Sequence, residues 1–235
     1  MNEMQLEVYY LPYSHLEDFD VLNALVYCDA SREYYWSDDF SAKYYMAQAK
    51  AGFISTARLH EGKELLLPKM AFSYALLDFK NLHISKKVKR LLIKNNLKLE
   101  ISQELDEVFE GIDSHHDNNW LSERYLDMLK RTKGKDKNFK VVSILIREDK
   151  KVISGEIGYI IGKTYTSLSG FSSKEKRYQN YGTAQLVMLA KYLEENDFSF
   201  WNLGQSDMEY KIVLGAKIFE RQAFLKRWRT NAYIV

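Results

Sequence analysis

Three strand-like runs in succession constrain the fold of this chain more than any other feature of its sequence. The runs cover residues 140–147, 152–161 and 164–171 and are rich in β-branched and aromatic residues. Only short turns separate them, a charged one at 148–151 and a glycine-containing one at 162–163. Because turns this short join antiparallel neighbours, the sequence predicts a sheet rich in hairpins.

Helical patterns accompany these strands along the chain. Apolar residues recur at helical spacing in segments 16–30, 41–51, 85–94, 103–111, 121–130, 182–195 and 208–214. Ser41 is of the type that caps a helix N-terminus. Further strands are expected at 97–101, 198–203 and 217–226. The order predicts an α+β fold with a mixed, mainly antiparallel sheet flanked by helices. A smaller N-terminal domain of helical pattern, 1–78, would precede a larger one, 79–235.

The composition is that of a globular protein with a buried core, since 46% of the 235 residues are apolar and 28% are charged. The most apolar stretch, 65–79, is interrupted by Pro68 and Lys69, so no membrane span is expected. The opening MNEMQLEVYY lacks the regions of a secretory signal. Cys28, the single cysteine, cannot form an internal disulfide, and we expect it to be a small buried apolar residue. These features favour a reducing cytoplasm.

Basic residues are clustered although the net charge is only +2. One cluster contains Lys86, Lys87, Lys89, Arg90, Lys94 and Lys98. A second cluster lies between residues 130 and 140. Such clusters form either solvated helix faces or surfaces that contact phosphate groups, and the sequence leaves both interpretations open.

A metal site is a further candidate, because His115 and His116 are adjacent. Zinc sites in proteins need three or four ligands at suitable spacing, and no third ligand stands near these two histidines in the required pattern. We therefore expect no metal.

The stretch RYQNYGTAQL at 177–186 follows the last of the three strands and opens a helix. Its segment 179–184 resembles the acyl-CoA loop of the GNAT superfamily of N-acetyltransferases, and segment 209–216 resembles the helix before the last strand of that superfamily. A glycine such as Gly182 lets backbone amides approach phosphate at the positive end of a helix. Alternatively, Gly182 and Ala184 permit close packing of the helix on the sheet. The resemblance implies a GNAT-like fold.

A more specific resemblance covers nearly the whole chain and concerns the leucyl/phenylalanyl-tRNA-protein transferase family, which is built on the same fold. Its clearest motif is LHISKKVKR at 82–90. The other matching stretches, in family order and at family spacing, are 39–53, 119–121, 155–158, 169–172, Gln205 and 214–216.

This resemblance implies transfer of leucine or phenylalanine from its tRNA to the α-amine of a protein that begins with arginine or lysine, which marks that protein for degradation. The acyl group arrives as an ester on the 3′ adenosine, so coenzyme A takes no part and no cofactor is expected. Such an enzyme positions an amine, removes a proton from it and stabilises the tetrahedral oxyanion.

The resemblance also assigns substrate-binding residues. Trp120 and Phe171 match aromatic residues of the family's side-chain pocket, although they would serve equally well as core aromatics. We assign Leu168 and Gly170, from the stretch that contains Phe171, to the same substrate site. Lys86, Lys87, Lys89 and Arg90 would contact tRNA phosphates, which fixes position without reading sequence.

Several family positions carry other residues here. The pocket tryptophan is replaced by Thr56, the active-site glutamate by Leu168 and an aspartate by Leu203. Gln205 alone of the polar catalytic set stands at its matched position. A glutamine cannot accept a proton as a general base, but it can orient the amine or the ester carbonyl.

Glu156 is our candidate for the missing carboxylate. A three-residue loop at 161–163 would place Glu156 directly opposite Leu168, on the same face of the hairpin. Burial in an apolar pocket would raise its pKa and make it a better proton acceptor near neutral pH. In the alternative, Glu156 is a solvent-exposed residue at a sheet edge.

Two other functions remain compatible with the sequence. The fit at 179–184 would also suit a CoA-dependent N-acyltransferase. The replaced carboxylates would suit a non-catalytic module that binds RNA or protein N-termini.

Overall fold

The structure is a computed structural model that describes residues 8–117 and 119–233. Most of the opening stretch, on which the expectation about a secretory signal depends, lies outside the described residues. No helix among the described residues is long and apolar enough to cross a membrane.

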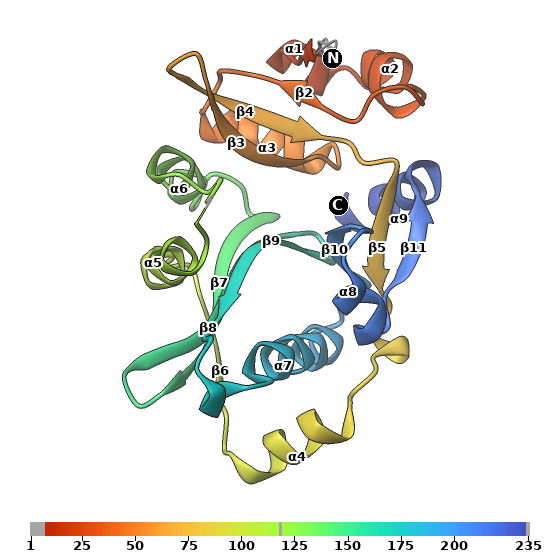
Figure 1. Cartoon of the computed structure of the whole chain (residues 1–235). Coiled ribbons are helices and arrows are strands. Elements are labelled where there is room, and N and C mark those ends of the chain that lie inside the picture. The colour runs from red at the N-terminus through yellow and green to blue at the C-terminus, as the bar shows by residue number, and fades with distance from the viewer. Residues whose placement is uncertain (1–7, 118, 234–235) are drawn as a thin grey trace, which may run out of the picture.

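A seven-stranded sheet forms the centre of the molecule, with strand order β11-β5-β10-β9-β8-β7-β6 (Figure 1). The strands are β5 (Ser73–Leu77), β6 (Leu99–Ser102), β7 (Phe139–Glu148), β8 (Lys151–Ile161), β9 (Thr164–Ser172), β10 (Phe200–Gln205) and β11 (Lys217–Glu220). Within this sheet, as described, only β9 and β10 pair in parallel, and the other neighbours are antiparallel. The predicted meander of three long strands is confirmed as β7, β8 and β9.

Helices cover both faces of this sheet. They are α4 (Lys86–Lys94), α5 (Asp106–His115), α6 (Glu123–Lys130), α7 (Tyr181–Glu195), α8 (Glu209–Leu214) and α9 (Arg221–Ala232). Figure 1 shows α7, with α4 outside it, on one side of the sheet and α5 with α6 on the other. The predicted α+β class, with a mixed, mainly antiparallel sheet flanked by helices, is confirmed.

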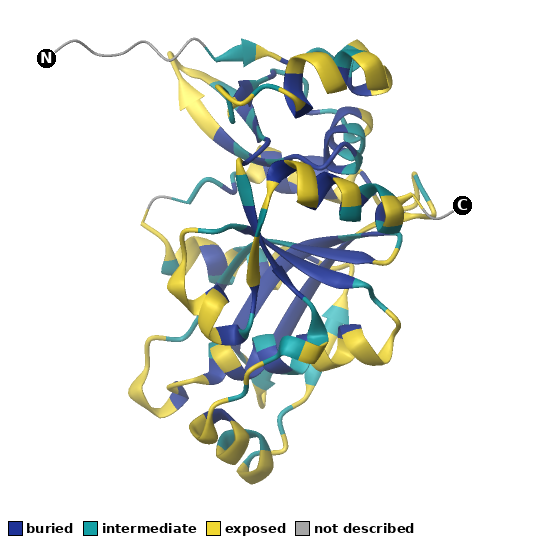
Figure 2. Cartoon of the chain, turned by 90° about the vertical axis from the view of Figure 1, so that its right-hand side faces the viewer, coloured by how far each residue is buried: buried dark blue, intermediate teal, exposed yellow. Residues whose placement is uncertain are grey.

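Successive residues of the central strands pack into different apolar clusters. In β7, Val142 and Ile144 belong to the cluster under α7, whereas Val141 and Leu145 belong to the cluster shared with α5, α6 and the N-terminal elements. Figure 2 shows the central strands buried along their length. Burial on both faces explains why these strands appear in the sequence as nearly continuous apolar runs.

The N-terminal elements form a small layer above the sheet. They are β1 (Tyr9–Tyr10), α1 (Tyr13–Glu17), α2 (Phe19–Leu22), a π-helical turn (Asn23–Tyr27), β2 (Tyr35–Trp36), α3 (Ala42–Lys50), β3 (Ile54–His60) and β4 (Lys63–Lys69). Ser41 caps α3 as expected, because its Oγ accepts the amide of Tyr44 at 3.1 Å. The hairpin of β3 and β4 was not predicted. Strand β5 lies before residue 78 but belongs to the large sheet, and a division into 1–78 and 79–235 stays a proposal.

The continuous helix predicted for 16–30 is wrong. Asp18 interrupts it, because its carboxylate accepts the amides of Asp20 and Val21 and so begins α2 afresh. The prediction that Cys28 is buried is also wrong. Cys28 is exposed at the end of the π-helical turn, where its thiol lies 3.7 Å from Asn23 Oδ1.

The last predicted strand ends much earlier than expected. Strand β11 stops at Glu220, and α9 begins at Arg221. Phe224, Leu225 and Trp228 are buried along α9 at helical spacing. The apolar residues after residue 220 have helical spacing, but the strand pattern before them led to the prediction of a strand.

Arg221 joins the N-terminal layer to the rest of the molecule. Its guanidinium group is buried and donates to five main-chain carbonyls, those of Val26, Asp29, Arg32, Met70 and Ala71. A guanidinium group has five N–H donors, so the side chain is fully satisfied without any carboxylate. This carbonyl clamp holds the π-helical turn, the segment after it and the residues that follow β4 against α9.

We predict that Arg221→Met lowers the free energy of unfolding by about 3 kcal/mol or more, because each buried carbonyl left without a donor costs about 1–3 kcal/mol. Urea unfolding measures this loss. Lys226→Met, an exposed change on the same helix, serves as the control. Equal unfolding midpoints for the two variants would show that the clamp contributes nothing.

Candidate active site

Strands β9 and β10 separate soon after they meet, and this separation creates the site. They pair only from Thr164 to Thr166 on β9 and from Phe200 to Asn202 on β10. Strand β9 nevertheless continues to Ser172 and β10 to Gln205. The remaining halves of the two strands therefore border an opening in the middle of the sheet.

Two bulges turn the strands apart. In β10, the register with β5 shifts between Asn202 and Gln205, and Gly204 there has a φ of +78° that favours glycine. The Asn202 side chain fixes this bulge, because its Oδ1 accepts the Gly204 amide at 2.9 Å. In β9, Leu168 is the extra residue between the pairs Ile157–Ser169 and Gly158–Ser167. Bulges of this kind bend a strand and redirect its side chains.

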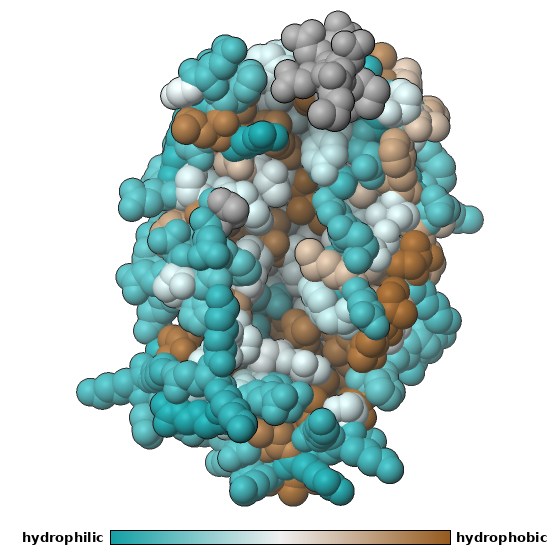
Figure 3. Space-filling view, in the orientation of Figure 1, coloured by the Kyte–Doolittle hydropathy of each residue, from teal (hydrophilic) through white to brown (hydrophobic). Residues whose placement is uncertain are grey.

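Two cavities occupy the opening and meet each other. The larger, of about 540 Å³, extends along β9 to the N-terminus of α7. The smaller, of about 250 Å³, reaches toward β3, β4 and β5. Both are lined by Trp120, Ser167, Leu168, Leu203, Met208 and Lys211. Figure 3 shows this face of the molecule hollowed near its centre.

Glu156 is the buried carboxyl group of the larger cavity, with only 5% of its surface exposed. Its Oε1 accepts hydrogen bonds from the Tyr165 hydroxyl at 2.6 Å and the Ser167 hydroxyl at 2.9 Å. The Trp201 indole N–H in turn donates to Ser167 Oγ at 2.9 Å. Burial raises the pKa of Glu156 to about 7, although the two hydroxyl donors oppose the shift. The alternative of an exposed residue at a sheet edge is wrong.

The predicted pairing of Glu156 with Leu168 is also wrong. The turn contains two residues, Gly162 and Lys163, and the bulge at Leu168 shifts the register again, so Glu156 lies opposite Gly170. Leu168 packs with the apolar cluster that contains Ile157, which points to the other face of β8. A carboxylate at 168 and one at 156 would therefore not occupy the same space.

Gly170 is necessary where it stands. A Cβ atom at this position would lie 2.8 Å from both Glu156 Cβ and the Gly155 carbonyl oxygen. No side chain can be added here without moving β8, so nothing from this position covers Glu156.

Aromatic side chains line the wall nearest α5. Trp120 lines both cavities and packs edge-on against Tyr125, with ring centroids 5.2 Å apart. Phe171 packs against the His115 ring and lies so close to Gly111 that a side chain there would overlap it. The neighbouring His116 contacts the Gly170 carbonyl at 2.9 Å through Nε2. Together with Leu168 these residues give one wall of the site an apolar surface.

Gln205 and Lys211 stand on the opposite wall. Gln205 lines the smaller cavity, and its main-chain carbonyl accepts the Lys211 ammonium group at 2.6 Å. Lys211 is only 3% exposed. Burial lowers the pKa of Lys211, and the Asp207 carboxylate partly opposes this effect. The sequence analysis did not identify Lys211 as a site residue. The one indication in the sequence was its position in a predicted helix, between Tyr210 and Ile212.

The helix that begins within RYQNYGTAQL, α7, starts beside the larger cavity. A Cβ atom on Gly182 would lie 2.9 Å from Ser172 Cβ, so the glycine allows α7 to pack closely on the end of β9. Gln185, one turn later, is 3% exposed and lines the cavity. Within the described residues its Oε1 has no hydrogen-bond donor. Close packing is thus sufficient to explain the glycine.

The expected tRNA-binding residues lie apart from the cavities. Lys86, Lys87, Lys89 and Arg90 are exposed on α4, which packs against α7 at the far side from the N-terminal layer (Figure 1). None of the four forms an ion pair within the described part of the chain. The structure therefore gathers Glu156, Trp120, Leu168, Gly170, Phe171 and, across the opening, Gln205 at one site and the basic residues on a separate surface.

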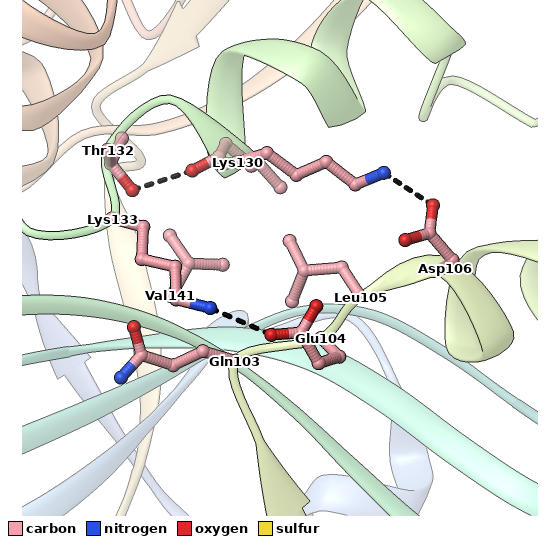
Figure 4. Close-up of a pocket in the computed structure, with 9 residues that line it drawn as sticks. Gln103, Glu104, Leu105, Asp106, Lys130, Thr132, Lys133 and Val141 are labelled. Carbon is pink, nitrogen blue, oxygen red and sulfur yellow. Dashed lines mark hydrogen bonds and ion pairs between the residues drawn. The ribbon is translucent and has the colours of Figure 1, made fainter.

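A third cavity, of about 210 Å³, lies between the start of α5 and the end of α6 (Figure 4). Its charged side chains are already paired, Lys130 with Asp106 and Lys133 with Glu104. Among the described residues that line this cavity, no charged side chain is left unpaired, and the opening beside β9 remains the candidate site.

Three solved structures resemble this chain at low identity. FemX is 13% identical over 93% of this chain and 81% of its own, with a TM-score of 0.48. The C-terminal domain of a putative lysylphosphatidylglycerol synthetase from Agrobacterium fabrum is 17% identical over 71% of this chain, with a TM-score of 0.42. L-PGS from Bacillus licheniformis is 11% identical over 82% of this chain, with a TM-score of 0.40. The chain covers 52% of each of the latter two.

A comparison with curated proteins finds no match. A family model described as leucyl/phenylalanyl-tRNA protein transferase matches residues 76–229. This match runs from the end of β5 through most of α9, and therefore contains both strands, β9 and β10, that border the opening. The chain belongs to the leucyl/phenylalanyl-tRNA protein transferase family.

Proposed function

We propose that this protein moves leucine, phenylalanine or a related amino acid from tRNA to the N-terminal amine of proteins that begin with arginine or lysine. The reaction would take place in the cytoplasm and mark the acceptor for degradation by the N-end rule. The observation that carries the proposal is the buried Glu156 carboxyl group beside an apolar wall, in a chain of this transferase family.

The proton chemistry fits a carboxyl group of this kind. The acceptor is an α-ammonium group, whose ordinary pKa is about 7.7–8.0, and it must lose a proton before its nitrogen can attack the ester. A carboxylate with a pKa near 7 accepts that proton with little loss of free energy, and about half of it is ionised at pH 7. Glu156 is therefore the proposed proton acceptor.

The walls of the cavity support recognition of the donor. Trp120, Phe171 and Leu168 offer an apolar surface to the side chain of the aminoacyl group, and Gly170 leaves room beside Glu156. Gln205, from the smaller cavity, can donate its amide hydrogens to the ester carbonyl. The four basic residues of α4 would bind phosphates of the same tRNA.

Two exposed carboxylates support a cationic acceptor. Asp207 and Glu209 flank Met208, which lines both cavities. Neither carboxylate forms an ion pair with another described residue. They could therefore pair with an arginine or lysine side chain whose own α-amine enters the opening.

One assay compares this proposal with its alternatives. Purified protein is incubated with Leu-tRNA or Phe-tRNA, acetyl-CoA and a peptide that begins with arginine, and the products are identified by mass spectrometry. We expect the peptide to gain one aminoacyl residue and no acetyl group. An acetylated peptide would favour the CoA-dependent acyltransferase. Binding of tRNA without any product would favour the non-catalytic module.

Glu156→Gln should lower kcat by about 10²–10⁴-fold, the usual contribution of a general base. Wild-type activity should fall as the pH drops below about 7, because protonation removes the acceptor, and the variant should lose this dependence. Glu194→Gln, an exposed change on α7, is the control. Wild-type turnover by Glu156→Gln would eliminate the proposed role.

As the pH rises and Glu156 ionises, activity should increase but the free energy of unfolding should decrease. The pKa of Glu156 is about 7 in the folded chain and near its usual 4.5 in the unfolded chain, so the unfolded state ionises first as pH rises. Ionisation therefore destabilises the wild type between these values, by about 3 kcal/mol at pH 8. We predict that Glu156→Gln gains stability relative to the wild type between pH 5 and pH 8, as measured by urea unfolding. A pH-independent difference would contradict the raised pKa.

The double change Glu156→Met with Leu168→Glu tests the corrected register. Because Leu168 packs on the other face of the hairpin, a glutamate there should not restore transfer. Recovery of activity in the double variant would contradict the register that the structure shows.

The basic face of α4 can be tested by salt dependence. Replacing Lys86, Lys87, Lys89 and Arg90 by alanine should weaken tRNA binding. The slope of log K against log salt should fall by up to about 3, since each phosphate contact releases counterions. The control removes the same charge from the second basic cluster, at Lys133, Lys135, Lys137 and Lys140. Equal slopes for the two variants would show that α4 is not the tRNA-binding surface.

A further inference from the structure

Lys211 is the one charged side chain of the described residues that lines both cavities. It comes from α8, directly after the bulge of β10, and it crosses toward the opening from the side opposite the apolar wall. The family resemblance assigned no role to this position, and the proposed proton acceptor, Glu156, is a separate group on strand β8.

The position of Lys211 is tightly fixed. Gly215 ends α8 with a φ of +110°, and a side chain there would overlap the Asn81 carbonyl oxygen. The Ala216 amide donates to the Lys211 carbonyl at 2.9 Å. Because this end of the helix lies against the chain near Asn81, a rotation of α8 that carried the ammonium group into solvent would disrupt these contacts.

The ammonium group has unused hydrogen-bonding capacity. One of its three N–H donors reaches the Gln205 carbonyl at 2.6 Å. Within the described residues, no other acceptor and no carboxylate lies within bonding distance of Nζ. A buried cation without an anion in direct contact is costly, so the arrangement favours a ligand that brings negative charge to this point.

Ester aminolysis develops negative charge on two oxygen atoms. The carbonyl oxygen becomes an oxyanion in the tetrahedral intermediate, and the ribose oxygen needs a proton when it leaves. Glu156 cannot stabilise either one as a carboxylate, and the Tyr165 and Ser167 hydroxyls already donate to it. A cationic donor on the facing wall supplies what the Glu156 side of the site lacks.

We propose that Lys211 is a further catalytic residue of the aminoacyl transfer, which stabilises the oxyanion and protonates the leaving ribose oxygen. This role rests on the proposed function. By lowering the pKa of the ammonium group, burial makes Lys211 a better proton donor than an exposed lysine.

The protons and electrons balance over the reaction. Glu156 first takes one proton from the α-ammonium group. The free amine then attacks the ester carbon, and the carbonyl electron pair moves to the oxygen bound by Lys211. The electron pair of the oxyanion then re-forms the carbonyl bond, and the bond from carbon to the ribose oxygen breaks. The ribose oxygen keeps the electron pair of that bond and takes a proton from Lys211. The new amide nitrogen returns its second proton to Lys211, and Glu156 releases its proton to solvent.

The first experiment measures transfer by the full-length protein with Leu-tRNA and a peptide that begins with arginine. Lys211→Met should lower kcat by about 10²–10³-fold with little change in KM for the peptide, since the lost contacts form mainly in the transition state. Lys211→Arg should retain oxyanion binding and recover part of the loss. Lys217→Met, an exposed change on β11, is the matched control and should behave as the wild type.

A second measurement separates proton donation from a structural role. A nitrophenyl ester of leucine has a leaving group that needs no proton, so the ratio of wild-type to Lys211→Met rates should fall to about 10 or less, with only the oxyanion contribution remaining. An equal loss with both esters would overturn the proposal and assign Lys211 to support of the β10 bulge. Unchanged kcat in Lys211→Met would overturn it as well. A wild type that transfers nothing from Leu-tRNA or from the ester would instead overturn the proposed function, and this role with it.

Discussion

The short pairing between β9 and β10 is the constraint on which the site depends. After Thr166 and Asn202 the two strands no longer pair with each other, and the sheet opens in its centre. The strands on either side of the opening keep their pairing. The outer strands remain continuous, because β8 stays paired to β9 past the opening and β5 stays paired to β10. A rigid sheet thus carries a gap, and the gap brings residues from β8, β9, β10 and α8 within reach of one ligand.

Ionisable side chains occupy both walls of this gap, although burial disfavours the charged form of each. The pKa of Glu156 is raised and that of Lys211 is lowered, so their proton affinities approach each other from opposite sides. Each is held by neutral partners, hydroxyl groups for Glu156 and a carbonyl for Lys211. Such an arrangement costs folding free energy, and the same cost makes both groups suitable for moving protons near neutral pH.

Much of this architecture could be predicted from the sequence, and the parts that could not have definite causes. The strands β7 to β9, the cap of α3 and the helix α7 follow from local period and residue type. The bulge at Leu168 cannot be read locally, because it depends on which residues of β8 it faces, and it overturned the pairing of Glu156. Lys211 escaped notice because burial of a lysine is decided by the contacts of α8 with distant segments. The N-terminal hairpin was not predicted because helical patterns dominate that part of the sequence. The helix after Glu220 was not predicted because a strand pattern precedes it.

Strand β5 has a consequence for how the chain is made. It lies between β10 and β11 in the sheet, yet more than a hundred residues separate it from both in sequence. On the ribosome, β5 and the segments before it emerge long before their partners, and loop closure over such a distance is slow. Arg221 follows β11 directly, so the residue that fastens the N-terminal layer appears only when the last strand is complete. The N-terminal third therefore cannot complete its packing until the final twenty or so residues have been synthesised. Until then it is accessible to chaperones and proteases.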